Sequence, residues 1–207
     1  MKKLLTVLFS LFFLSSPSVF ADDISDFEIE GISIGDSLLD YMTEDEILKE
    51  IERNKNDYAY LNEPNKYVEI YLYKDFPTYS FVSVFIKNNS TNKYLTNKNE
   101  KYRILSPRGF IRYIEEFDNC IQKRDEIIEV FSEMFPNAQK IEDFHKHAID
   151  PSGNSIVDAV YFNFDSGAHS EVSCTNFEET LRINKNWSEG LSVIVRPEEI
   201  ISWLRDH

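Results

Sequence analysis

The residues best suited to chemistry lie in a polar segment of the second half of the chain. Asp143, His145 and His147 alternate along this segment, and His169 follows after a turn. In an extended segment these alternate side chains share one side, where neutral imidazoles can chelate a transition metal. A lone His-x-His is also frequent in surface loops, and structural zinc sites use other spacings. A metal site built from these four residues is therefore a minor alternative.

A hydrolase is a second minor alternative. Ser152-Gly153, Ser166-Gly167 and the histidines supply common ingredients for hydrolysis. The chain contains no nucleophile-elbow, S-x-x-K or H-E-x-x-H motif, and it has no Walker loop or dinucleotide fingerprint. Both Ser-Gly pairs lie in sequences typical of polar turns. An enzyme is thus the less favoured interpretation, and the sequence predicts no cofactor.

Aromatic residues mark a candidate binding surface. Residues 67–73 and 78–87 alternate in the manner of two strands, and a turn with Pro77 joins them into a hairpin. Alternation puts the aliphatic side chains on one face and these rings on the other: Tyr67, Tyr71, Tyr73, Tyr79, Phe81 and Phe85. Tyrosine suits recognition because its ring gives contact area and its hydroxyl tolerates water. We expect an accessible patch, with core or cross-strand packing as the alternative.

The cysteine pair predicts a disulfide. Cys120 lies on the apolar stripe of a predicted helix, and Cys174 shares a strand face with Val172. Both sulfur atoms therefore point towards one helix–sheet interface. A reactive thiol would need a lowered pKa and usually a neighbouring base or a C-x-x-C spacing, which the chain lacks. A structural bridge is the favoured interpretation.

The elements that must position these residues predict an α+β fold. Strands that follow one another through short turns pair in antiparallel fashion, and helices then pack mainly on one face of the sheet. A twofold repeat of a helix followed by strands, with a boundary near residue 115, is an open alternative. The predicted helices cover residues 43–53, 118–135 and a segment after Pro197, and the remaining strands lie near 102–105, 138–142, 155–165, 171–177 and 191–195.

Composition and the N-terminus indicate an exported protein. A formal net charge of −14 excludes a duplex-DNA reader and a polybasic membrane binder. Residues 1–21 resemble a cleavable signal peptide, with Lys2 and Lys3 before an apolar stretch and Val19-Phe20-Ala21 at its end. We expect residues 22–207 to form one domain in the periplasm or outside the cell. No membrane association is expected after cleavage.

Several short motifs carry a resemblance to a known group of proteins: residues 31–38 (GISIGDSL), 118–120 (DNC), 125–127 (DEI), 150–155 (DPSGNS), 162–167 (FNFDSG) and 172–174 (VSC). With these motifs the chain resembles small exported proteins of marine alphaproteobacteria with streamlined genomes. The resemblance implies export and the paired cysteines, and it carries no activity, ligand or catalytic residue. The sequence thus favours a non-enzymatic binding module for a small molecule, a carbohydrate or a protein.

Overall fold

The computed structural model describes residues 24, 27–54, 67–88 and 97–206, and they form a seven-stranded sheet, a two-stranded sheet and several helices. The α+β class predicted from sequence is confirmed. The predicted signal segment, residues 1–21, lies outside the described residues. In chain order the elements are β1 (Glu28–Ile29), β2 (Ile32–Ser33), the 3-10 helix η2 (Leu38–Asp40), α1 (Glu44–Asn54), β3 (Tyr67–Leu72), β4 (Phe81–Lys87), α2 (Lys98–Lys101), β5 (Ile104–Arg112), α3 (Phe117–Met134), β6 (Gln139–Lys146), β7 (Ile156–Asn163), β8 (His169–Asn176), α4 (Glu179–Lys185), β9 (Gly190–Arg196) and α5 (Glu198–Arg205).

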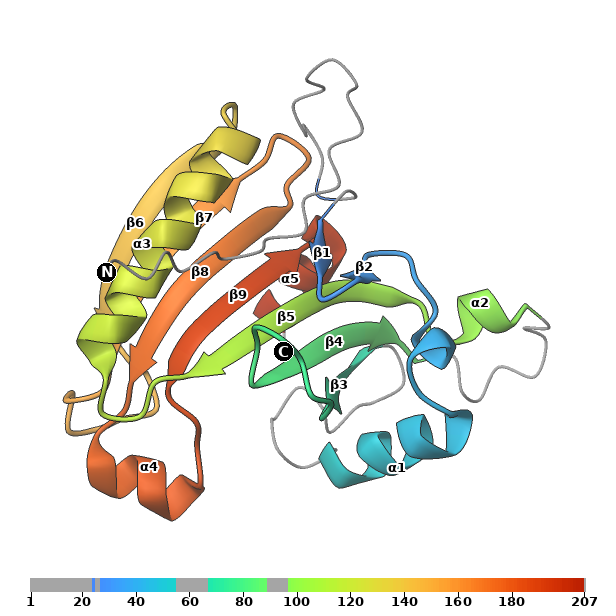
Figure 1. Ribbon diagram of the computed structural model, residues 1–207, viewed down its shortest axis with the longest axis horizontal. Coiled ribbons are helices and arrows are strands. Elements are labelled where there is room, and N and C mark those ends of the chain that lie inside the picture. Colours follow the sequence, from blue (N-terminus) through green and yellow to red (C-terminus); the bar gives the residue numbers. More distant parts are fainter. Residues whose placement is uncertain (1–23, 25–26, 55–66, 89–96, 207) are drawn as a thin grey trace, which may run out of the picture.

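The large sheet has the strand order β3-β4-β5-β9-β8-β7-β6, and all neighbouring strands are antiparallel (Figure 1). β3 to β5 form one meander after α1, and β6 to β8 form another after α3. The repeat boundary expected near residue 115 falls in the turn between β5 and α3. β9 lies between the two meanders and belongs to neither, so the repeat is incomplete.

α1 and α3 cover one face of the sheet, which carries the main core. Alternation directs Val82 of β4, Val172 of β8 and Val193 of β9 to this face, where all three are buried. α3 contributes Ile128 and Phe131 from its apolar stripe. Each buried aliphatic side chain contributes roughly 1.5–3 kcal/mol. We call this side of the sheet the helix face.

α5 packs on the opposite face, behind the sheet in Figure 1. Its Trp203 contacts the rings of Tyr67 and Phe85 edge-on, with centroid distances of 5.1 and 6.2 Å. The Tyr67 hydroxyl donates a hydrogen bond to Glu199 at the start of α5. α5 therefore closes a second, smaller core over one corner of this face.

Local signals account for two element boundaries. The predicted capping box begins α1: Glu46 accepts from the Thr43 amide at 2.8 Å, and the Thr43 hydroxyl accepts from the Glu46 amide at 3.4 Å. β5 is longer than predicted because it continues through Pro107, while its pairing with β9 begins one residue later at Arg108. The missing N–H of Pro107 therefore removes no hydrogen bond from that ladder.

α4 was not predicted from sequence. None of its residues is buried, so it lacks the apolar stripe by which an amphipathic helix is recognised. Its start is stabilised by the Glu178 carboxylate, which accepts a hydrogen bond from the Leu181 amide at 2.8 Å. The capping interaction decides the position of this helix.

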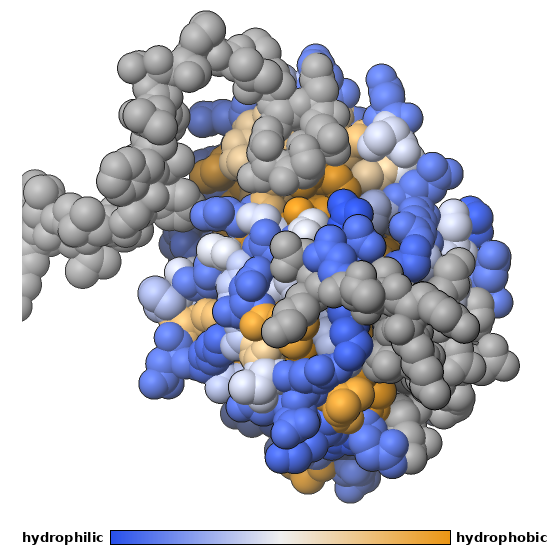
Figure 2. Space-filling model, turned by 90° about the vertical axis from the view of Figure 1, so that its right-hand side faces the viewer, coloured by the Kyte–Doolittle hydropathy of each residue, from blue (hydrophilic) through white to orange (hydrophobic). Residues whose placement is uncertain are grey.

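Among the described residues, no helix has the length and apolar character needed to cross a bilayer. Figure 2 shows that hydrophilic side chains dominate the face turned towards the viewer, where apolar side chains gather in a few small groups.

Candidate binding face of the sheet

The four residues proposed as metal ligands do not converge. Asp143 and His145 lie together on β6, with Oδ2 and Nδ1 2.9 Å apart. β6 ends at Lys146, so His147 leaves the alternation, and its ring packs on Phe177 and Trp187. His169 lies on β8. Among the residues that the structure describes, no group of three or more His, Cys, Asp or Glu side chains is arranged to hold a metal ion.

The six aromatic residues predicted to share one accessible patch are divided by the tertiary structure. α5 buries Tyr67 and Phe85, and Phe81 is buried against Phe110. Tyr79 precedes β4 and packs on the helix face against Gly109, where a Cβ atom would come within 2.4 Å of the Tyr79 ring. The patch is therefore reduced to two partly accessible rings, Tyr71 and Tyr73.

The two Ser-Gly pairs belong to turns. Asp150 accepts hydrogen bonds from the backbone amides of Ser152, Asn154 and Ser155, at 2.8, 3.1 and 2.7 Å. Hydrogen bonds from Ser152 and Ser155 hold the pKa of Asp150 well below its usual range. The Ser166 hydroxyl accepts from the Ala168 amide at 3.5 Å. These contacts stabilise turns and present no activated serine nucleophile.

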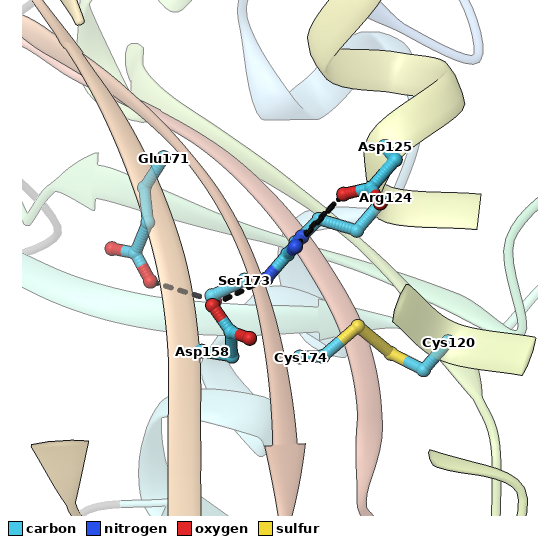
Figure 3. The surroundings of a disulfide bond; sticks show 7 residues. All are labelled: Cys120, Arg124, Asp125, Asp158, Glu171, Ser173 and Cys174. Atoms are coloured by element: carbon cyan, nitrogen blue, oxygen red, sulfur yellow. Dashed lines mark hydrogen bonds and ion pairs between the residues drawn. A yellow bond between two sulfur atoms is a disulfide. The ribbon is translucent and has the colours of Figure 1, made fainter. Parts of the chain in front are cut away.

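Cys120 and Cys174 form the predicted disulfide, with Cα atoms 6.0 Å apart and both side chains fully buried (Figure 3). The bridge joins α3 to β8 on the helix face. Beside it, Arg124 of α3 forms an ion pair with Asp158 of β7. Figure 3 shows the disulfide on one side of β8 and the Glu171 carboxylate on the other. β8 thus links the stabilised helix face to a polar surface behind it.

Within the described part of the chain, the area of the face opposite α1 and α3 that α5 leaves open carries two networks of charged side chains. We name this surface the polar face, and it comprises Glu69, Ser83, Arg108, Tyr161, His169, Glu171, Ser173, Ser192 and Arg196. Cross-strand register places all of them on one side of the sheet, because directly opposed residues share a face.

The first network is centred on Arg108 of β5. Its Nε donates a hydrogen bond to the Ser192 hydroxyl at 2.9 Å, and its Nη1 lies 3.8 Å from Glu69 Oε1. The Ser83 hydroxyl donates to the same carboxylate oxygen at 2.8 Å. Glu69 is only 3% exposed, so these groups must compensate for the cost of burying its charge.

The second network is centred on Arg196 of β9. Its Nη1 donates to Glu171 Oε2 at 2.7 Å and lies 3.3 Å from His169 Nε2. The Ser173 hydroxyl donates to the other oxygen of Glu171 at 2.8 Å. The two networks are neighbours in space, because Arg108, Ile194 and Glu171 oppose one another across β5, β9 and β8.

These surroundings set the ionisation of the second network. Burial and the Arg196 charge lower the pKa of His169 to about 4. Burial alone would raise the pKa of Glu171, but Arg196 and the Ser173 hydroxyl hold it below its ordinary value. Burial and the carboxylates of Glu171 and Asp143 raise the pKa of Tyr161 to about 12. At neutral pH the network therefore holds a neutral imidazole, a carboxylate and a neutral phenol.

A row of rings lies beside the Arg108 network. This aromatic row consists of Tyr73, Tyr71, Phe81 and Phe110, with neighbouring centroids 6.1, 5.7 and 4.9 Å apart. Arginine side chains lie over it: the Arg108 guanidinium is 5.2 Å from the Phe110 centroid, and that of Arg112 is 5.5 Å from Phe81. Tyr73 is 58% exposed at the outer end of the row.

The hydrogen-bond order argues against a catalytic triad on β8. In such a triad a histidine connects the nucleophile to an acid. Here Ser173 donates directly to Glu171, and His169 contacts Arg196 instead. Because arginine can only donate, His169 Nε2 accepts in this contact and is not positioned to take a proton from Ser173. The arrangement is suited to binding charged groups.

The sequence contains a periodic signal for the polar face. His169, Glu171 and Ser173 alternate along β8 with residues of the helix face, and Arg108, Phe110 and Arg112 do so along β5. Alternation alone could not show that these strands lie close together, since β9 separates them. Comparisons with protein-family models, curated proteins and solved structures find no match for this chain.

Proposed function

We propose that the protein is a non-enzymatic binding module that recognises an acidic partner through the polar face and the aromatic row. The observation that carries this proposal is a group of three arginines, Arg108, Arg112 and Arg196, on one face of a chain with a net charge of −14. Arg108 and Arg196 are ion-paired with Glu69 and Glu171, whereas Arg112 is exposed and forms no ion pair among the described residues. The charge of Arg112 therefore favours an anionic partner.

Burying the charged groups of the polar face costs free energy, which supports a role for this face beyond stability. Buried ion pairs contribute little net stability compared with apolar side chains of similar volume. Among the described residues, Arg196 Nε is a buried donor with no hydrogen-bond partner, which adds to that cost. A core built for stability alone would favour aliphatic residues at Glu171 and Arg196.

The chemistry of the surface indicates the class of partner. Guanidinium N–H groups match carboxylates, and arginine and tyrosine are enriched at protein interfaces. The surface extends from Tyr73 beyond β3 to Tyr161 on β7, across several strands. Such breadth favours a segment of a partner protein with acidic and aromatic residues over a small molecule or a carbohydrate.

The proposal can be tested by NMR titration of the isotope-labelled protein with a random copolymer of glutamate and tyrosine. We expect chemical-shift changes on β5, β8 and β9, and weaker changes on these three strands with a lysine–tyrosine copolymer of equal length, which the acidic remainder of the protein should bind instead. Changes confined to the helix face, or equal responses of β5, β8 and β9 to both copolymers, would contradict the proposal.

Two variants at the accessible end of the surface should weaken this binding without unfolding the protein. Arg112→Gln removes an exposed cation and Tyr73→Ala an exposed ring, and each should reduce affinity about tenfold. Lys123→Gln on α3 changes the net charge by the same amount as Arg112→Gln and lies outside the polar face. It should bind as the wild type does.

We also propose that the protein works in an oxidising compartment after export. The disulfide supports this, because such bonds persist in the periplasm and outside the cell. The signal-like residues 1–21 add a sequence argument. Intact-mass measurement of protein isolated from its producing cells should give a chain that begins at Asp22 and has no free thiol. A retained N-terminus or two free cysteines would exclude this proposal.

A further inference from the structure

Among the residues that the structure describes, β6 is an edge strand of the large sheet (Figure 1). All its residues are exposed, and Phe144 is 64% exposed, more than the other large apolar side chains of the described chain. An edge strand presents unpaired backbone N–H and C=O groups that can pair with another strand. The edge and its exposed ring therefore form a surface suited to strand addition.

Along β6 the charged side chains change from acidic to basic at Phe144. Glu142 and Asp143 precede this residue, and His145 and Lys146 follow it. Antiparallel pairing with a second copy, about a twofold axis at Phe144, would place each acidic residue opposite a basic one. Lys146 of the second copy would face Glu142, and His145 of the second copy would face Asp143.

We propose that the protein self-associates through this antiparallel β6 pairing. A twofold axis perpendicular to the sheet keeps the two helix faces on the same side. The two Phe144 rings then meet on the helix face, between two Glu142–Lys146 pairs. On the opposite face the pairing brings two Asp143–His145 pairs together. The contact joins two seven-stranded sheets into one at the β6 edge, next to β7, where the proposed binding face ends.

Other registers that preserve the faces are less complementary. An axis at Asp143 would oppose the two Asp143 carboxylates and set Lys140 against Lys146. An axis at Ile141 would pair Lys140 with Glu142 but leave Lys146 outside the strand pair. Within one copy, Glu142 already lies 3.3 Å from Lys140, an exposed contact that contributes little. Of these three registers, the Phe144 register therefore places the most acidic residues opposite basic ones.

Sedimentation equilibrium from micromolar to millimolar protein tests the proposal, because a contact made by one strand is small and its affinity modest. We expect a reversible dimer. Lys146→Glu should raise the dissociation constant about tenfold, because the new glutamate of each copy would face Glu142 of the other copy. The double variant Glu142→Lys/Lys146→Glu exchanges the two charges, so each pair is again of opposite sign. Its dissociation constant should be within about threefold of the wild-type value.

Lys140→Glu is a matched control, because it makes the same charge change on the same strand and face. It should alter the dissociation constant less than about threefold, since Lys140 faces no charge in the Phe144 register. Phe144→Ser should weaken the dimer, and circular dichroism should show all variants folded. The proposal is wrong if the wild type stays monomeric throughout, if Lys140→Glu matches Lys146→Glu, or if the double variant fails to associate.

Discussion

The two faces of the large sheet are built in different ways. The helix face carries closely packed aliphatic side chains and the disulfide between α3 and β8. On the opposite face, small serines such as Ser83 and Ser173 lie buried beneath long arginine and glutamate side chains. One strand contributes to both, since Cys174 and Ser173 are neighbours on β8. The helix face supplies stability, whereas the polar face keeps charged groups at a cost in stability.

The largest effect should come from the helix face. Replacing Cys120 and Cys174 by alanine removes a cross-link with a sequence separation of 54, which should lower the free energy of unfolding by about 4 kcal/mol. Denaturant unfolding followed by circular dichroism measures this loss. Reduction of the wild-type disulfide is the control and should give a similar value. A loss below about 1 kcal/mol would show that the bridge is not a main source of stability.

A smaller loss is expected when the Arg196 network is broken. Arg196→Leu leaves the partly exposed Glu171 carboxylate without its cation and should reduce the unfolding free energy by about 2 kcal/mol, less than for a fully buried pair. The double variant Arg196→Leu/Glu171→Leu removes both charges and should be more stable than Arg196→Leu. The ion pair itself stabilises the fold if the double variant is clearly less stable than the wild type, and the contrast between the faces then weakens.

A pH-dependent loss should follow from His169. Its pKa of about 4 in the folded protein is below the ordinary value of 6.5, so the unfolded chain binds a proton first as the pH falls. Stability attributable to this residue is therefore complete above about pH 6.5 and declines towards pH 4. NMR titration of the imidazole and unfolding at several pH values test this, with His169→Gln as control. An ordinary pKa would contradict the proposed burial beside Arg196.

The smallest effect on stability should come from Tyr73. Its ring is mostly exposed, so Tyr73→Ala should change the unfolding free energy by less than about 0.5 kcal/mol. Tyr67→Ala removes a fully buried ring beneath Trp203 and should cost about 3 kcal/mol. Thermal unfolding of both variants separates a surface ring from a core ring. Similar losses would mean that the aromatic row is part of the core.

Local sequence determined much of the fold. Alternation identified the β3–β4 hairpin and the sides of its strands, because side chains in a strand change sides at each residue. Helical periodicity put Cys120 on the apolar stripe of α3, and alternation put Cys174 beside Val172, so the disulfide followed from two local patterns. The capping box at Thr43 set the start of α1 through contacts within four residues.

The tertiary structure alone decided which residues of a face meet and which stay accessible. Alternation could place Tyr67 and Phe85 on one side but not show that α5 covers them. Alternation also could not predict that Tyr79 lies on the helix face, since a turn and the space at Gly109 position that ring. The two charged networks became neighbours because β9 pairs with both β5 and β8. Local periodicity assigns sides within a strand, whereas strand order and helix docking depend on contacts between distant residues.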